Sequence, residues 1–286
     1  MVARCSQQLV PYLLLLPAAA FLLVFFAYPM VEAFGLAFAG PGGAFTLDNV
    51  RRAVTDVAFT PALETTLLLI LIIIPVQFVL ALAMALLVQA KLKGASFFLY
   101  VYAIPLAISE LAAGIVWFSI FTDRGFINSL LVSLGVLERP FLFLSFQNTG
   151  WLIFAVVMAE SWRATSIIMV ILVAGLQSIS HEYLEAADVF GATPWQRTWH
   201  VTLPLLKPSL QVALILRTIL AFQVFAVALA VAGRGITLLA AEAYRWYNTY
   251  RDPGVAAVYA AIILVLSIAS TLIFLYALRT PKEQSL

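Results

Sequence analysis

Residues 67–88 have the sequence LLLILIIIPVQFVLALAMALLV and contain no charged side chain. A helix needs about 20 mainly apolar residues to cross the hydrocarbon core of a bilayer. Pro75 lies inside this stretch, which a membrane helix tolerates when neighbouring groups satisfy the freed carbonyl. The stretch therefore predicts a membrane-spanning helix, and several similar apolar runs follow and precede it.

The composition of the whole chain agrees with that prediction. Of 286 residues, 64% are hydrophobic and 10% are charged, against roughly 25% charged in an average soluble domain. A water-soluble fold is therefore excluded. The net charge of +2 and the lack of any Lys/Arg run longer than Arg51–Arg52 argue against a nucleic-acid partner. Cys5 is the only cysteine, so an intramolecular disulfide or a Cys-rich metal site cannot form.

We predict an all-α polytopic membrane protein that forms one domain over residues 1–286. The N-terminal run is too long for the core of a signal peptide, so we expect it to be retained as the first helix. With six spans, both termini lie on one side of the membrane. The predicted spans are 10–38, 62–89, 96–121, 149–177, 210–232 and 254–278.

The distribution of Lys and Arg does not decide the orientation. With both termini inside, seven of the sixteen basic residues lie on the inner side and seven on the outer side. The remaining two, Arg163 and Arg217, fall within spans. An excess of basic residues normally marks cytoplasmic loops, and here there is no excess.

A polar segment at residues 178–208 separates the fourth and fifth spans. Ser180 is placed to cap a short helix, and Gly191 is placed to end it in the left-handed conformation. Thr193 and Gln196 have the spacing of a capping box around Pro194, which predicts a second short helix toward His200. Prolines 204 and 208 are expected to limit that second helix.

The two short helices carry large apolar side chains outside the spans, and two interpretations follow. The helices either dock into another protein or lie on the lipid surface. The apolar residues concerned are Tyr183, Leu184, Val189, Phe190, Trp195 and Trp199.

The same segment resembles the signature E-A-A-x3-G-x9-I-x-L-P of ABC importer permeases. Val201 stands in place of the usual isoleucine, and Phe190 stands where sugar permeases commonly have aspartate. The residues that carry the resemblance are Glu185, Ala186, Ala187, Gly191, Val201, Leu203 and Pro204, at the spacings of the signature. The position of the segment between two spans is the one that the family requires.

This resemblance implies the type I ABC importer permease fold, with residues 178–208 as a cytoplasmic coupling segment. Glu185 would then meet a basic residue of an ATPase subunit, and Gly191 would form the turn. Both termini would be cytoplasmic, in the inner membrane of a bacterium. The implied partners are a second homologous permease, an ABC ATPase dimer and an extracytoplasmic solute-binding protein.

The resemblance extends along almost the whole chain and favours the carbohydrate-uptake branch, which is similar to maltose-type and glycerol-phosphate-type importers. Ala226 replaces an aspartate that is usual in that branch, which leaves the solute class open. A sugar, a polyol or a glycerol phosphate each fits. The chain contains no GxxxxGK[ST] phosphate loop, so we expect no cofactor in it; ATP and Mg would bind the partner ATPase.

Charged residues inside predicted spans are costly and suggest function. Glu110 is either an acid of the solute pathway or a buried carboxyl bonded to a neighbouring helix. Glu160 and Arg163 lie three residues apart, which favours a structural ion pair. Arg217 is expected to extend its long side chain toward the membrane interface.

A sugar pathway requires aromatic platforms for apolar C–H faces together with neutral hydrogen-bonding groups. Any single aromatic residue is more often a packing residue or an interfacial anchor. The candidate pathway residues are Glu110, Trp117, Phe222, Gln223, Phe225 and Tyr244.

Two other classes of function predict different features. A secondary transporter driven by an ion gradient would use Glu110 as its proton or cation site. A membrane enzyme would need a nucleophile with a base and an orienting group, and no such spacing is present, so we assign no catalytic residue. His181 and His200 are the only histidines, too few for a convincing metal site.

Overall fold

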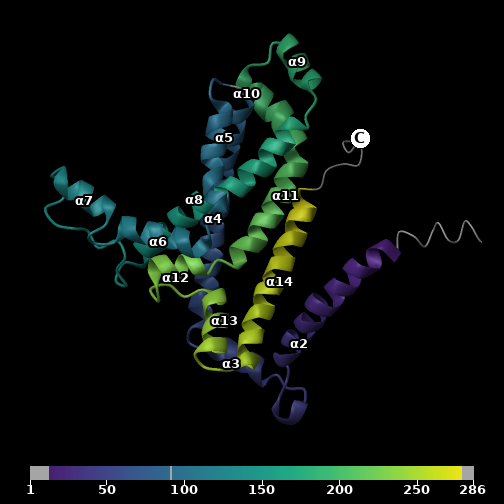
Figure 1. Ribbon diagram of the computed structural model, residues 1–286, viewed down its shortest axis with the longest axis vertical. Helices are drawn as coiled ribbons and strands as arrows, with labels where there is room; N and C mark the ends of the chain where they lie inside the picture. Colours follow the sequence, from purple (N-terminus) through teal and green to yellow (C-terminus); the bar gives the residue numbers. More distant parts are fainter. Residues whose placement is uncertain (1–12, 91, 279–286) are drawn as a thin grey trace, which may run out of the picture. The chain divides into compact units, whose positions relative to one another are not determined.

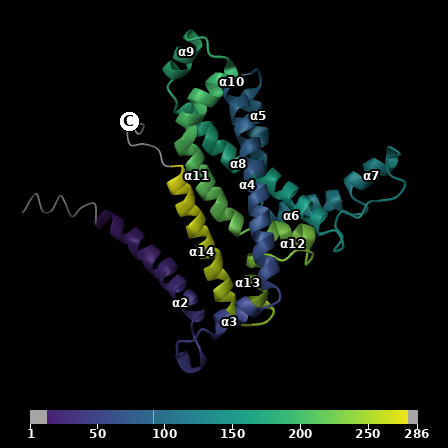
Figure 2. The ribbon, with the colours of Figure 1, turned by 180° about the vertical axis from the view of Figure 1, so that it is seen from behind.

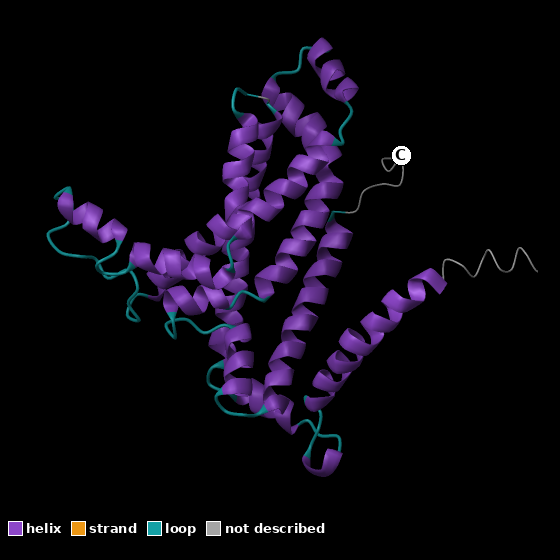
Figure 3. Cartoon of the chain, in the orientation of Figure 1, coloured by secondary structure: helices purple, strands orange, loops and turns teal. Residues whose placement is uncertain are grey.

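The computed structural model describes residues 13–90 and 92–278. This part of the chain is almost entirely helical (Figure 3), and its only β pairing is an isolated bridge between Ala39 and Phe45. Six of its helical stretches are long and apolar enough to cross a membrane. The prediction of an all-α polytopic protein with six spanning helices is confirmed.

The contacts divide the chain into two compact units. Unit 1 comprises Met1–Phe59 and Glu242–Ile262, and unit 2 comprises Thr60–Ala241 and Ile263–Leu286. The single domain over residues 1–286 stays a prediction.

Unit 1 holds the N-terminal helical run and the short helix α3. The Asn49 side chain donates hydrogen bonds to the carbonyls of Leu36 and Ala39, both at 3.1 Å. Arg52 forms an ion pair with Asp252 at 2.6 Å. These contacts connect α3 to the end of the N-terminal run and to Asp252, which precedes α14. The elements of unit 1 are the run Leu13–Leu36 with η1 (Leu23–Ala27) and α2 (Tyr28–Leu36), η2 (Pro41–Gly43), α3 (Asp48–Thr55), most of α13 (Leu239–Asn248) and the start of α14 (Pro253–Ala277).

Unit 2 contains most of the spanning helices, arranged around α8 (Thr149–Gln177). One core cluster joins α8 to α4, α6 and α12, and a second joins it to α4, α5 and α11. Figures 1 and 2 both show α6 and α12 side by side. The remaining elements of the unit are α4 (Phe59–Gln89), α5 (Ala95–Ala103), η3 (Ile104–Ala107), α6 (Glu110–Phe121), α7 (Phe126–Ser133), α9 (His181–Val189), α10 (Pro194–Arg197), η4 (Thr198–Thr202), α11 (Leu203–Phe222) and α12 (Ala226–Ala232).

The third predicted span, 96–121, is interrupted in the structure. Pro105 lies in the 3-10 turn η3, and Ile108 and Ser109 are extended. The Ser109 hydroxyl then caps α6 by accepting a hydrogen bond from the Ala112 N–H at 3.2 Å. The apolar stretch long enough to span is Glu110–Ser133, so Glu110 begins a helix, whereas the predicted span 96–121 placed it near the middle.

The fifth predicted span, 210–232, also differs. The spanning stretch is Pro194–Phe222, and the helix ends at Gln223, before a separate helix α12 begins after Phe225. The other spans agree closely with their expected bounds: α8 has the predicted ends, and α14 is displaced by one residue. Residues 10–12 of the first predicted span lie outside the described residues.

Gly114 sets the close approach of α6 to α12. A Cβ atom at this position would lie 2.5 Å from the Ala230 Cβ and 3.0 Å from the Val227 carbonyl oxygen. The hydrophobic effect does not drive helices together inside a bilayer, so their association depends on van der Waals contact, which small residues allow by letting the backbones approach closely. We expect Gly114→Ala to push the two helices apart and to destabilise the protein by about 1–3 kcal/mol.

Thermal unfolding of the purified protein in detergent measures this loss. Gly150→Ala is the matched control, since nothing lies within 4 Å of its Cβ position. Equal melting temperatures for the two variants would contradict the close approach.

Candidate functional site

The polar segment between α8 and α11 folds as its local sequence predicts. Ser180 caps α9, with its hydroxyl accepting from the Glu182 N–H at 3.4 Å. Gly191 has φ +75°, the left-handed conformation that glycine adopts without strain. The Thr193 hydroxyl and the Gln196 side chain form both halves of the capping box around Pro194. These three predictions are confirmed.

The second short helix does not end at the prolines, contrary to prediction. α10, the π-helical turn η4 and α11 form one helical stretch from Pro194 to Phe222. Pro204 lies in the first turn of α11, directly after η4, and Pro208 lies inside α11. A π turn shifts the hydrogen-bond register by one residue, which accommodates a proline that cannot donate. The polar segment between α8 and α11 therefore continues into a spanning helix without a break.

An ion pair joins the two short helices across the Gly191 turn. Arg197 Nη1 donates to both carboxylate oxygens of Asp188, at 2.9 and 2.8 Å. This contact was not predicted, because Asp188 and Arg197 lie nine residues apart on different short helices. The pair holds α10 at one angle to α9.

The motif residues occupy distinct environments. Glu185 is exposed and lies 3.4 Å from the ring of His181. Ala187 is buried, whereas Ala186 is exposed. Leu203 and Pro204 begin α11.

Large apolar side chains of this segment are exposed to the surroundings. The Trp195 and Trp199 rings contact each other edge to face, with centroids 5.5 Å apart. Exposed apolar side chains gathered in this way fit either a protein partner or the lipid surface. Its exposed members are Tyr183, Val189, Phe190, Trp195 and Trp199.

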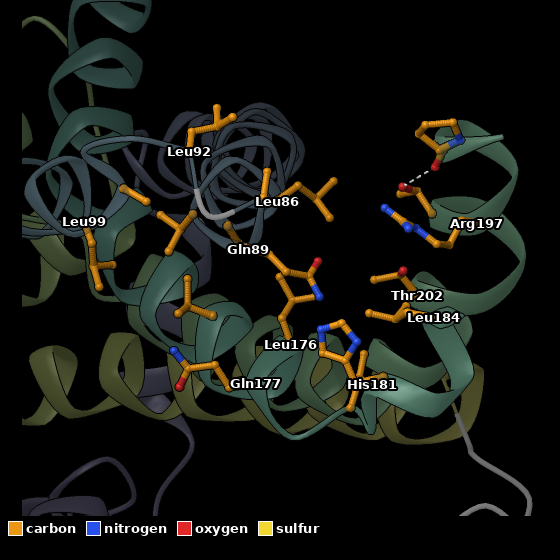
Figure 4. A pocket seen from close by; sticks show the side chains of 18 of the residues that line it. Leu86, Gln89, Leu92, Leu99, Leu176, Gln177, His181, Leu184, Arg197 and Thr202 are labelled. Carbon is orange, nitrogen blue, oxygen red and sulfur yellow. Dashed lines mark hydrogen bonds between the residues drawn. The ribbon is translucent and has the colours of Figure 1, made fainter. Parts of the chain in front are cut away.

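Behind α9 and α10 lies a cavity of about 1080 Å³. Leu86, Leu99 and Leu176 form part of its apolar wall. In Figure 4, the side chains of His181 and Arg197 face the cavity from α9 and α10. The cavity thus lies between the two short helices and the ends of α4, α5 and α8; α9 is joined to α8 through residues 178–180, and α10 continues through η4 into α11.

A second cluster of functional groups is buried among the spanning helices. Arg217 on α11 is 1% exposed, and Glu160 on α8 is fully buried. Arg217 Nη2 donates to Glu160 Oε1 at 2.7 Å, and its Nε donates to Gln77 Oε1 at 2.6 Å. Gln77 Nε2 in turn donates to the Glu160 backbone carbonyl at 2.9 Å. Three spanning helices, α4, α8 and α11, therefore meet at the Arg217 guanidinium.

The prediction that the Arg217 side chain extends toward the membrane interface was wrong. Its guanidinium does not extend to the interface, because Glu160 and Gln77 provide an ionic partner and an acceptor inside the bundle. The sequence did carry a signal for this site: Gln77 is the only polar residue in the apolar stretch 67–88.

Arg163 extends the network to α6. Its Nε and Nη2 donate to the two oxygens of Glu160 at 3.1 and 2.8 Å, which confirms the predicted pair. Nη2 also donates to Glu110 Oε1 at 3.1 Å, and Glu110 further accepts from the backbone of Ala226, where α12 begins. Glu110 is thus bonded to a neighbouring helix, as one of its two interpretations expected, but its side chain is 36% exposed rather than buried.

Apart from Trp117, the other pathway candidates lie on other elements than Glu110. Trp117 on α6 packs against Trp162 of α8, with ring centroids 6.3 Å apart. Phe222 is buried at the end of α11, while Gln223 is exposed and Phe225 is half-buried in the following break. Tyr244 belongs to unit 1 and is half exposed. Among the described residues, no group of three or more His, Cys, Asp or Glu is placed to hold a metal ion.

Comparison with known proteins adds independent information. Residues 77–282 match the family described as the binding-protein-dependent transport system inner membrane component. A trehalose/maltose transport system permease protein of Thermococcus litoralis is 30% identical, with 92% of each chain covered. An sn-glycerol-3-phosphate transport system permease protein of Yersinia enterocolitica is 29% identical, covering 94% of this chain and 93% of that one.

The fold is also similar to that of a solved structure. A chain of a bacterial alginate ABC transporter, crystallised in complex with an alginate pentasaccharide-bound periplasmic protein, superposes with a TM-score of 0.79. The two chains are 21% identical, and the match covers 98% of this chain and 97% of the other.

The buried network yields a prediction about charge balance. Arg217→Met leaves two carboxylates and one guanidinium among the spanning helices, and we expect it to destabilise the protein by about 3–5 kcal/mol. The double variant Glu160→Gln/Arg217→Met restores one charge of each sign, on Glu110 and Arg163. It should therefore recover part of the lost stability, as measured by thermal unfolding in detergent. A double variant less stable than Arg217→Met alone would contradict the charge argument.

Proposed function

The chain belongs to the family of binding-protein-dependent transport system inner membrane components, and from that premise we propose that it is the permease subunit of an ATP-binding cassette importer for a sugar-like solute. It would form half of the translocation pathway. The observation that carries this proposal most directly is the pair of short capped helices with exposed aromatic side chains, which is continuous with a spanning helix.

The coupling segment has the features of a docking element. Its conformation is determined by two helix caps, a left-handed glycine and the Asp188–Arg197 ion pair. Its exposed Trp195 and Trp199 offer the kind of aromatic anchor that is common at protein interfaces. We propose that the segment docks on the ATPase subunit, where Glu185 meets a basic residue.

A continuous helix can transmit a displacement of this segment into the bundle. The stretch from Pro194 to Phe222 has 29 residues and a length of about 40 Å. It carries Arg217, which binds α4 and α8 through Gln77 and Glu160. Movement imposed at α10 would therefore reach the helices of the pathway through side-chain contacts that cannot stretch without exposing a buried charge.

The other subunits of the importer would be separate chains. The sequence holds no phosphate-binding loop, so ATP and Mg would bind a separate ATPase dimer. A second homologous permease would complete the pathway, and an extracytoplasmic binding protein would deliver the solute. Docking to a cytoplasmic ATPase requires that the coupling segment and both termini lie in the cytoplasm, with the chain in the bacterial inner membrane.

The polar groups within the bundle favour this function over an ion-gradient transporter. A proton site needs a carboxyl group that gains and loses its charge during the cycle. Glu110 instead shares Arg163 with Glu160, in a network with two positive and two negative groups. Its charge is part of a balanced structure.

Co-purification of the tagged chain with the products of its neighbouring genes tests the proposed function. We expect an ATPase to co-purify and its activity to rise when a sugar-loaded binding protein is added. Isolation of the chain alone, together with uptake driven by an ion gradient, would overturn the proposal.

Within the assembled complex, Glu185→Gln should reduce sugar-stimulated ATPase activity by about tenfold or more. A charge-assisted hydrogen bond contributes about 1.5–3 kcal/mol, and 1.4 kcal/mol corresponds to a factor of ten. Glu182→Gln is the matched control, as an exposed carboxylate on the same helix. Equal activity of both variants, in complexes that assemble normally, would exclude Glu185 from coupling.

A further inference from the structure

The outer part of the buried ionic network remains accessible in the single chain. The Glu110 side chain is 36% exposed and that of Arg163 is 19% exposed, whereas Glu160 is fully buried. Both residues lie in stretches long enough to span a membrane. Charged groups in such stretches face protein or a water-filled path and avoid the hydrocarbon of the lipid. The exposed edge of this ion pair therefore points to an aqueous pathway.

Aromatic side chains lie beside the ion pair. Glu110 and Trp117 lie about two helical turns apart on α6, and Gly114 between them packs against α12. Trp117 contacts Trp162, which directly precedes Arg163 on α8 and is itself 36% exposed. The surface thus combines a carboxylate, a guanidinium and two indole rings from two adjacent helices.

The charge of this surface is balanced. Arg163 bonds to both Glu160 and Glu110, and the second guanidinium, Arg217, bonds to Glu160. The two positive and two negative charges cancel. A solute at this surface meets a carboxylate acceptor and a guanidinium donor with no surplus positive charge. The more exposed of the two groups is the carboxylate, which repels anions.

We propose that Glu110, Arg163, Trp162 and Trp117 form a solute contact that selects neutral polyhydroxylated molecules over those bearing a phosphate, carboxylate or sulfonate. Neighbouring hydroxyls of a sugar can donate to Glu110 and accept from Arg163, while an apolar face of the ring packs on an indole. This inference rests on the proposed function and narrows its solute class.

Equilibrium binding to the purified permease–ATPase complex, without binding protein, tests the selection. Quenching of tryptophan fluorescence is the readout, and the probes are two matched pairs: trehalose with trehalose 6-phosphate, and glycerol with glycerol 3-phosphate. We expect at least one neutral probe to bind about tenfold more tightly than its phosphorylated partner. Glu110→Gln should weaken binding of that neutral probe about fivefold and reduce the difference within the pair.

Two further variants keep the test decisive. Trp162→Ala lies outside the ionic network and should also weaken binding of the neutral probe. Glu64→Gln, which removes an exposed carboxylate of α4, should change nothing. Tighter binding of the phosphorylated member, or unchanged binding in both Glu110→Gln and Trp162→Ala, overturns the inference. Loss of assembly in Glu110→Gln together with unchanged binding in Trp162→Ala assigns this surface to the partner permease and also overturns it.

The proposed function is judged by a separate measurement. If the ATPase of the complex responds to a sugar-loaded binding protein while the complex shows no preference for neutral probes, that result refutes only the proposed selectivity for neutral over anionic solutes. A complex that shows no such response refutes the proposed function itself.

Discussion

A guanidinium in the interior of a helix bundle must have a carboxylate beside it, and this constraint organises the larger unit of the protein. Arg217 is 1% exposed, and it is held by Glu160 from α8 and by Gln77 from α4. Burying either charge alone costs several kcal/mol, so the helices that carry the partners cannot separate independently. Arg163 and Glu110 extend the same requirement to α6 and to the start of α12.

The two parts of the candidate site are connected by a single helix. The capped short helices lie at one end of the stretch Pro194–Phe222, and Arg217 lies near the other. The cavity lies behind α9 and α10, and α9 is also joined to α8 through residues 178–180. Exposed aromatic side chains and a charge-balanced helix junction are thereby carried by one helical stretch, which suits a protein whose two ends must respond to one another.

Local features of the sequence were predictable, and long-range ones were not. The caps at Ser180 and Thr193 and the left-handed Gly191 depend on groups within three residues, so the order of residues specifies them. The contacts of Arg217 connect positions 57 and 140 residues apart, and only the packing of the helices decides them. The breaks before α6 and α12 were missed because hydrophobicity continues through them. At Pro105–Ser109 the break follows from backbone chemistry, but a proline such as Pro75 is tolerated in α4, so proline alone is not diagnostic.

The order of the charged residues along the chain has a consequence for biogenesis. Glu110 emerges from the ribosome first, then Glu160 with Arg163, and Arg217 last. The helix α8 enters the bilayer as an internally neutral segment, because its two charges are three residues apart and bonded. Until α11 is synthesised, the network lacks Arg217 and holds two carboxylates against one guanidinium. Its charge balance is therefore completed only late in synthesis, when Arg217 reaches the carboxylate of Glu160.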